Sequence, residues 1–327
     1  MKTMQKSKPV VLVAVGLVLA GLALSAAARA ETLTLLSFNM RGAGANDQKS
    51  IDETVAVIKA TGAEIIAAQE TVPEPEPCDA GNCVAGDLSQ SRAKAIAAAL
   101  GYFYHEFKHN QPHHWADAVF SKYPIGKETP NGVGVEITVK GEKIVVYSMN
   151  LPDAPYQPYQ ILKIPYGSYP FVTSAVEAIS FAKQARGEAL KLLTADIASQ
   201  GDARAQFVMG DFNEPSHLDW TVAAVAAKLQ PMVIEFPFSK ALSDLGFVDS
   251  FRAIYPAVVA KPGFTWTPTT EPTDPEDHHD RIDFILVRGK GVSVTAAGIV
   301  GEKSPEADLV VTPWPSDHRA TLAKVKW

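Results

Sequence analysis

Short apolar runs of strand length alternate with segments of helical periodicity along the chain. Residues 33–39 (LTLLSFN) and 64–70 (EIIAAQE) are mostly apolar up to their last residues, which is typical of buried strands. Between them, residues 50–62 repeat apolar side chains at helical spacing. Residues 89–101 show a similar spacing and end at a glycine, a residue that commonly caps helices. The pattern predicts strand, helix, strand and helix in this part of the chain.

The rest of the chain holds further predicted strands, several of them neighbours of the hairpin type. Residues 135–139 and 143–149 flank Gly141 and predict one hairpin. Residues 205–210 form an apolar run that stops at Asp211, after which the sequence becomes helix-like. The remaining predicted strands are residues 102–107, 117–121, 281–287, 291–300 and 319–325. Since no repeat or long linker divides the sequence, mixed sheets with helices packed outside them are expected, in one domain.

The beginning of the chain has a different pattern. Three lysines precede an apolar run over residues 10–24, and an Ala-Arg-Ala sequence follows at residues 28–30. This order is typical of a cleaved export signal over residues 1–30 and predicts a periplasmic or secreted protein. An uncleaved membrane anchor is the alternative, because the apolar run is slightly long for a signal. Residues 31–327 are then the expected single domain.

Composition and charge narrow the classes of protein that remain. The 327 residues are 46% hydrophobic and 20% charged, which is ordinary for a globular chain. Four of the 30 basic residues and none of the 36 acidic ones lie within residues 1–30, so the remainder carries a formal charge of −10. That balance offers no general electrostatic surface for nucleic acid, although a local basic groove is compatible with it. Cys78 and Cys83 are the only cysteines; in an exported chain they predict a disulfide, and they are too few for a zinc site.

Polar side chains stand at the ends of several predicted strands. Taken singly they have ordinary explanations: Asn39 as a turn residue, Glu70 as solvated surface, Asp211 as a helix N-cap. Together, acids, amides and one imidazole at strand ends are what a phosphoryl-transfer site with a hard metal ion requires. The set comprises Asn39, Glu70, Asp211, Asn213, Asp283, Asp317 and His318.

The motifs around these residues occur in a characteristic order. LLSFNMR, IIAAQE, SKYPIG, VMGDFNE, GFVDSFR, FTWTP, RIDFILV and PSDHRAT follow one another over nearly all of residues 31–327. In this order they resemble the endonuclease/exonuclease/phosphatase superfamily, which has the DNase I-like fold. The resemblance implies a four-layered α/β/β/α sandwich of two mixed, mostly antiparallel sheets flanked by helices. It also implies a metal-dependent hydrolase acting on phosphoester bonds by in-line attack of water, without a covalent intermediate.

The resemblance assigns roles to the residues that match its motifs. Glu70, with Asn39 beside it, matches the ligand of a divalent metal, Mg²⁺ or Mn²⁺, and Asp317 stands where another metal-facing acid is often found. Asp211 matches the residue that orients or deprotonates the attacking water. Asn213 matches the amide that steadies this water and the phosphate.

Two further residues form the expected phosphate-contacting pair. His318 matches the histidine that contacts the scissile phosphate, and Asp283 matches the carboxylate that holds the imidazole and favours its charged form. Asp280 is a rival for the partner role, and the motif favours Asp283. One position departs from the pattern: Asn150 follows a strand where the superfamily usually has histidine, or tyrosine in some nucleases. An amide donates a hydrogen bond to phosphate but cannot deliver a proton.

The substrate class follows less directly from the sequence. The expected partner is a phosphoester, either a small molecule, a lipid headgroup or a nucleic acid, and no feature implies a protein partner. The acidic balance and the export signal favour a small or lipid phosphodiester over duplex DNA, and an exported nuclease is the alternative. Residues 152–167, rich in Pro and Tyr, predict a surface loop that shapes the substrate pocket or, equally, a packed loop without that role.

Two readings from other classes of protein compete with hydrolysis of phosphoesters. Residues 105–109 (HEFKH) have the spacing of a zinc protease motif, which works only on a helix, whereas the surrounding pattern predicts a strand. His113 and His114 follow closely, so the stretch is expected to be a strand end and polar loop at the rim of the site. Direct contact of one of these histidines with phosphate is a separate hypothesis. The second alternative is a catalytically silent binding module, and Asn150 is the one substitution that favours it.

Overall fold

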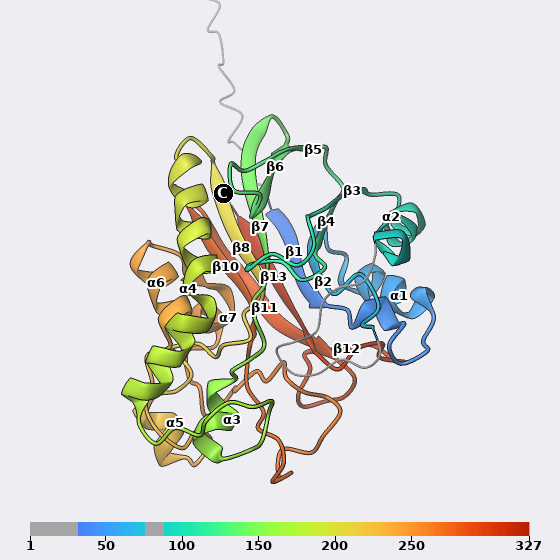
Figure 1. Cartoon of the computed structure of the whole chain (residues 1–327). Coiled ribbons are helices and arrows are strands. Elements are labelled where there is room, and N and C mark those ends of the chain that lie inside the picture. Colours follow the sequence, from blue (N-terminus) through green and yellow to red (C-terminus); the bar gives the residue numbers. More distant parts are fainter. Residues whose placement is uncertain (1–31, 76–87, 327) are drawn as a thin grey trace, which may run out of the picture. The chain divides into compact units, whose positions relative to one another are not determined.

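The computed structural model describes residues 32–75 and 88–326, and within these ranges the strands form two mixed sheets (Figure 1). The seven-stranded sheet contains the first and last strands of this part of the chain side by side. β1 and β2 are parallel neighbours, whereas β1 and β13 are antiparallel. In sheet order the strands are β12 (Leu309–Val310), β11 (Ser293–Gly301), β13 (Ala320–Lys326), β1 (Thr32–Asn39), β2 (Ile65–Gln69), β4 (Ala118–Ser121) and β3 (Phe103–Glu106).

The six-stranded sheet is built from the middle of the chain. β7 and β8 are parallel, and the other pairings within it are antiparallel. Its order is β5 (Ile125–Glu128), β6 (Gly134–Val139), β7 (Glu142–Asn150), β8 (Ala205–Asp211), β10 (Asp283–Gly289) and β9 (Val248–Asp249). The strands predicted from the apolar runs are therefore confirmed, including the β6–β7 hairpin around Gly141.

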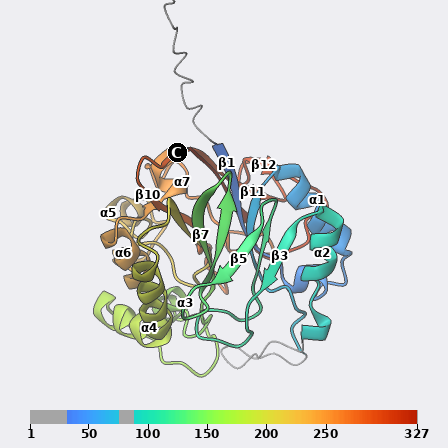
Figure 2. The ribbon, with the colours of Figure 1, turned by 90° about the horizontal axis from the view of Figure 1, so that it is seen from above.

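Helices cover the outer faces of both sheets, with α1 and α2 on one side and α4 and α6 on the other (Figure 2). This arrangement is the α/β sandwich that the motifs imply. The helices of the described ranges are α1 (Ile51–Thr61), α2 (Ala93–Leu100), α3 (Gln157–Leu162), α4 (Ala175–Ser199), α5 (Val222–Ala226), α6 (Pro237–Asp244) and α7 (Ser250–Ile254), with short 3₁₀ turns η1 (Gly42–Gly44) and η2 (Leu88–Gln90).

The apolar character of β1 on both faces explains its place in the sandwich. Leu33 and Leu35 point into the core between the two sheets, where they meet Val146 and Phe207 of the other sheet. Phe38, with the opposite parity, packs in the core beneath α1 and α2. Burying each such side chain stabilises the fold by about 1.5–3 kcal/mol. A strand that contributes to two cores is therefore mostly apolar along its length, with Ser37 as a buried polar exception.

Two stretches differ from the sequence prediction. The long helix α4 was not among the predicted elements, because its alanine-rich sequence has weak amphipathic periodicity. A start signal is nevertheless present: Ser174 accepts from the backbone N–H of Glu177 at 3.2 Å, and the Glu177 carboxylate accepts from the Ser174 hydroxyl at 3.0 Å. The helix-like expectation for the stretch after Asp211 is wrong, since residues 213–220 form turns and α5 begins only at Val222.

Several expectations concern residues outside the described ranges. The export signal over residues 1–30 and the disulfide between Cys78 and Cys83 stay predictions. Within the described ranges, every helix is too short or too polar to span a lipid bilayer.

Candidate active site

The strand ends that carry the predicted polar residues meet at one place in the fold. In the six-stranded sheet, Asn150 of β7 is paired with Asp211 of β8, and Asp211 is paired with Asp283 of β10. From the other sheet, the Asn39 side chain reaches across and donates to Asp211 at 3.1 Å. All four residues are the first or last of their strands: register brings together Asn150, Asp211 and Asp283, and the packing of the two sheets adds Asn39.

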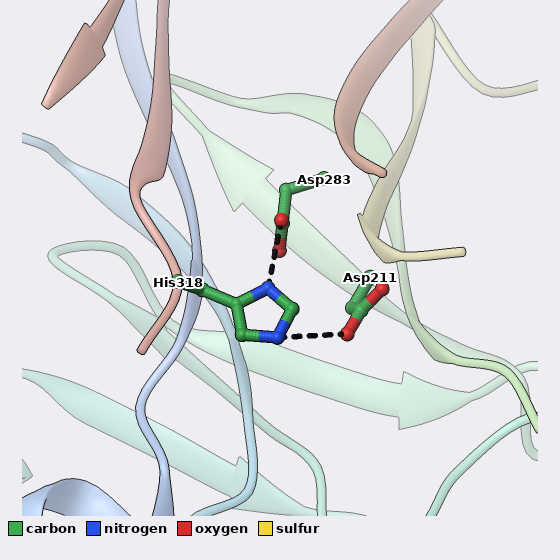
Figure 3. A group of neighbouring side chains, drawn as sticks. All are labelled: Asp211, Asp283 and His318. Carbon is green, nitrogen blue, oxygen red and sulfur yellow. Dashed lines mark hydrogen bonds and ion pairs between the residues drawn. The ribbon is translucent and has the colours of Figure 1, made fainter. Parts of the chain in front are cut away.

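His318, just before β13, lies between two of these carboxylates (Figure 3). Its Nδ1 is 3.0 Å from Asp283 Oδ2, and its Nε2 is 3.7 Å from Asp211 Oδ2. Burial alone would lower the pKa of His318, but the charges of Asp283 and Asp211 outweigh it and raise the pKa well above its usual value. The two carboxylates therefore favour the charged form of the imidazole. The structure also decides between the rival partners, since Asp280 instead accepts from Trp220 Nε1 at 2.9 Å and from Tyr156 OH at 3.0 Å.

Asp211, Asp283 and His318 have the spacing of a group that could bind a metal ion. The candidate ligand atoms of Asp211, Asp283 and His318 lie within 4.8 Å of one another, close enough to hold an ion. A histidine must offer a neutral nitrogen to a metal, however, and both carboxylates favour its charged form. We therefore interpret the three as an ion-paired group, in which His318 Nδ1 is hydrogen-bonded to Asp283.

Asp211 is held in place by backbone and side-chain amides. Its Oδ1 accepts from the backbone N–H of Asn213 at 2.8 Å, and this short turn with a left-handed Asn213 (φ 46°) replaces the helix cap considered from the sequence. Asn213 in turn donates to the carbonyl of Leu151 at 2.9 Å. Burial, and then the neighbouring Asp283, raise the pKa of Asp211 to about 7, while His318 opposes the rise. A carboxyl group with such a pKa can accept a proton near neutral pH.

Glu70 stands next to this group at the end of β2, in a left-handed backbone conformation (φ 56°). Asn39 Nδ2 donates to its Oε1 at 2.8 Å, and the amide oxygen of Asn39 accepts from the backbone N–H of Arg41 at 3.1 Å. Asn39 therefore positions the Glu70 carboxylate through its amide nitrogen. Its amide oxygen, the atom that could bind a metal, is engaged by the Arg41 backbone instead. Burial first, and then the charges of Asp317 and Glu74, raise the pKa of Glu70 well above its usual value. Carboxylate oxygens gathered where their charges repel one another fit a hard divalent cation.

Asp317 has a partner that the sequence analysis did not consider. Arg41 Nη1 forms an ion pair with Asp317, and Arg41 Nε is 3.3 Å from Asp47. Arg41 has a left-handed backbone (φ 47°) two residues after the strand end at Asn39, and it lines the same cavity as the acids. Its position in the motif LLSFNMR was the available signal. The guanidinium is the one Lys or Arg side chain among the described residues of the lining.

A cavity of about 690 Å³ opens over these residues. Glu70, Asn150, Asp211, Asp317 and His318 line one end, so these residues of the predicted set lie around one cavity. The Pro- and Tyr-rich residues 152–167 do shape the cavity: they contain α3, and its flanking residues line the other end. Trp266, a further lining residue missed in the sequence, packs its ring 5.0 Å from the His318 ring, measured between centroids.

The zinc protease motif is excluded by its backbone conformation. His105 lies on β3, not on a helix, and its Nε2 is 2.8 Å from Glu128. The expected histidine contact with phosphate is also not supported: His113 and His114 are buried, and the lining from this loop comes instead from its polar and aromatic neighbours Asn110, Gln111 and Trp115.

Comparison with known proteins agrees with the fold. The chain is 26% identical over 311 residues to the uncharacterized protein F14F9.5 of Caenorhabditis elegans, a match that covers 89% of this chain and 90% of that protein. Among solved structures, the 3′ phosphatase NExo from Neisseria, bound to a product DNA hairpin, is 13% identical with a TM-score of 0.55, and the match covers 90% of this chain and 100% of that one. TDP2 from C. elegans is 16% identical with a TM-score of 0.51, covering 90% and 75%.

A two-sheet α/β sandwich with acids, amides and a histidine gathered at strand ends is the arrangement that the motifs imply for a phosphoester hydrolase. The model of the Endonuclease/Exonuclease/phosphatase family matches residues 36–318 of the chain. The protein belongs to this family, whose members are nucleases and phosphatases. The structural matches, all below 25% identity, show the shared fold.

Proposed function

We propose that the protein is an exported, divalent-metal-dependent phosphodiesterase that hydrolyses a small or lipid phosphodiester. The observation that carries the proposal is the charged His318, held by Asp283 and facing Asp211 at the end of a cavity. Export rests on the signal-like pattern of residues 1–30. The cavity volume of about 690 Å³ lies in the range of pockets that bind small molecules, which supports a small or lipid substrate.

The residues suit in-line attack of water on phosphorus. Asp211, with a pKa of about 7, orients the water and accepts its proton, while the amides of Asn39 and Asn213 fix the carboxylate. The His318 imidazolium stabilises charge on the phosphoryl oxygens as it develops. Asn150 is placed beside Asp211 to donate a hydrogen bond to the same phosphate. An Mg²⁺ or Mn²⁺ ion held by Glu70 would polarise a phosphoryl oxygen and neutralise charge in the transition state.

The first expected outcome concerns the metal. Hydrolysis of bis-(p-nitrophenyl) phosphate should be lost in excess EDTA and restored by Mg²⁺ or Mn²⁺, because the ligands near Glu70 are oxygens only. The Glu70→Gln variant, which removes the negative charge of the proposed ligand and leaves one neutral carbonyl oxygen, should need a higher metal concentration for half-maximal rate. Full activity in EDTA would contradict metal assistance, and absence of hydrolysis with every metal would favour a silent binding module.

A second expected outcome concerns Asn150. A neutral amide lacks the positive charge that an imidazolium would place against the leaving group, a contribution of roughly 2–4 kcal/mol by analogy with other preorganised donors. The Asn150→His variant should therefore raise turnover most for an ester with a poor leaving group, with little change for p-nitrophenyl esters. Both esters should be measured for the wild type and the variant. Equal ratios for the two would rule out a role in the leaving-group step.

The choice of substrate class is tested by a panel. Plasmid DNA, RNA, sphingomyelin and bis-(p-nitrophenyl) phosphate should be compared at equal enzyme and metal concentration. The proposal expects kcat/KM to be highest for a lipid or small phosphodiester, because the acidic lining disfavours a polyanion. A preference for plasmid or RNA would instead support the nuclease alternative.

A further inference from the structure

The cavity over the active site has a second end with a different chemistry. We call the four side chains Tyr156, Tyr159, Tyr166 and Trp266 the aromatic pocket. Trp266 connects this pocket to the catalytic end, because its ring packs against His318. A substrate whose phosphate lies at His318 can therefore extend its neighbouring group towards these rings.

The rings of the aromatic pocket are arranged as corners. Tyr156 and Tyr159 lie 4.8 Å apart between centroids with their planes at 89°, and Tyr159 and Tyr166 lie 5.8 Å apart at 86°. A planar group such as a nucleobase stacks best on a parallel face or between two of them. A corner of perpendicular rings instead suits a rounded group that contacts several rings at once.

Carboxylates anchor every hydroxyl of the aromatic pocket. Because each phenol donates to an acid, the ring orientations are fixed before substrate binds, and negative charge is placed behind the rings. Trp266 is fixed in the same way, with its Nε1 3.2 Å from Asp277 Oδ1. The three phenolic bonds join Tyr156 to Asp280 at 3.0 Å, Tyr159 to Asp277 at 2.5 Å and Tyr166 to Asp153 at 2.5 Å.

The charged side chains that line the whole cavity are mainly acidic. Among the described lining residues, Arg41 and His318 are the cationic groups, and both are already engaged by acids. The carboxylates are more numerous: Glu70, Glu74, Asp153, Asp211, Glu276 and Asp317. A second negative group on the substrate would be repelled, whereas a positive group would be attracted.

Building on the proposed phosphodiesterase function, we propose that the aromatic pocket binds a cationic organic group, an amine or quaternary ammonium, carried by the phosphoester substrate. Ring faces attract a cation within about 6 Å of their centroids, and carboxylates behind the rings add to this attraction. The anionic phosphate and the cation of such a zwitterionic ester match the two ends of the cavity.

The proposal is tested with two esters that differ in one atom. p-Nitrophenyl phosphocholine carries a quaternary nitrogen, and p-nitrophenyl 3,3-dimethylbutyl phosphate carries carbon at that position, with the same shape and leaving group. With Mg²⁺ present, kcat/KM should be roughly tenfold higher for the cationic ester, the scale of a desolvated cation–aromatic contact. The difference should lie mainly in KM, because the contact is remote from the bond that breaks.

Variants locate the preference in the aromatic pocket. Tyr166→Leu removes a partly exposed ring but keeps an apolar side chain, and Asp153→Asn removes the charge that anchors it. Both should bring the ratio between the two esters close to one. The matched controls are Tyr169→Leu, an exposed ring on the same segment outside the lining, and Asp244→Asn, an exposed acid paired with Lys240 on α6. Both controls should keep the wild-type ratio.

Binding without turnover gives an independent measurement. Calorimetry with phosphocholine and 3,3-dimethylbutyl phosphate, on the wild type and on Tyr166→Leu, should show tighter binding of phosphocholine in the wild type alone. Equal kcat/KM and equal affinity for the charged and neutral compounds would overturn the cation pocket while leaving the phosphodiesterase intact. A preference that survives both pocket variants would overturn its location. Hydrolysis of neither ester with any divalent metal would instead count against the proposed function itself.

Discussion

The Asp211→Asn variant should lose at least about 100-fold in kcat without losing stability. Asparagine keeps the shape of the side chain and can still contact Asn213, but it cannot accept a proton from water, and a general base contributes about 10²–10⁴-fold. Asp211 is 1% exposed, and burial and Asp283 raise its pKa to about 7. A carboxyl whose pKa is raised in the folded state makes the fold less stable as the pH rises from its unfolded value towards 7. A neutral amide removes this cost, so the melting temperature at pH 8 in EDTA should be unchanged or higher.

Asp117→Asn is the matched control for this variant. Asp117 is also a fully buried carboxyl whose pKa is raised well above its usual value, chiefly by burial. It accepts from the Ser148 hydroxyl at 2.9 Å, between the sheets and outside the cavity lining. We expect kcat of Asp117→Asn to stay within about threefold of the wild type, the size of a minor packing change. Near-normal turnover of Asp211→Asn, or an equal loss in both variants, would contradict the assignment of Asp211.

The gross fold was predictable because both faces of the central strands are buried. Leu35 and Phe38 of β1 enter different cores, so the strand appears in the sequence as a nearly continuous apolar run. α4 was missed because alanine contributes little to an amphipathic pattern, although the Ser174 and Glu177 cap marks its start. The turns after Asp211 were mistaken for a helix because the left-handed conformation of Asn213 has no signature in apolar periodicity.

The active site was predictable to the extent that it is built from strand ends. Asn150, Asp211 and Asp283 are brought together by strand register, so their order in the sequence sufficed. Arg41 lies in a turn, and Trp266 lies at an isolated bridge to Asp280 and His318. Both positions depend on tertiary packing, about which single-sequence patterns carry little information. The orientation of the Asn39 amide depends on its hydrogen-bond partners and likewise required the structure.

His318→Ala should lower kcat by at least about 100-fold, which corresponds to about 3 kcal/mol of lost transition-state stabilisation. The imidazole is buried, bonded to Asp283 at 3.0 Å and charged, so it can face the phosphoryl oxygens with its Nε2–H without reorganising during the reaction. Alanine removes the hydrogen bond and the charge together. His318→Gln separates the two effects, because its amide can donate a hydrogen bond but has no charge. If the charge contributes more than the hydrogen bond, kcat of His318→Gln should be at most about tenfold higher than kcat of His318→Ala.

Stability and a second histidine provide the controls for His318. Alanine leaves Asp283 buried without its partner, so a loss of about 1–3 kcal/mol in the free energy of unfolding is expected, and kcat must be measured well below the melting temperature of each variant. His105→Ala removes a partly exposed histidine that contacts Glu128 and does not line the cavity. Its turnover should be unchanged, which also tests the HEFKH motif for catalysis. If His318→Ala stays folded and hydrolyses the phosphodiester at a near-normal rate, the charged imidazole is not part of the chemistry, and Asp211 with the metal must account for it.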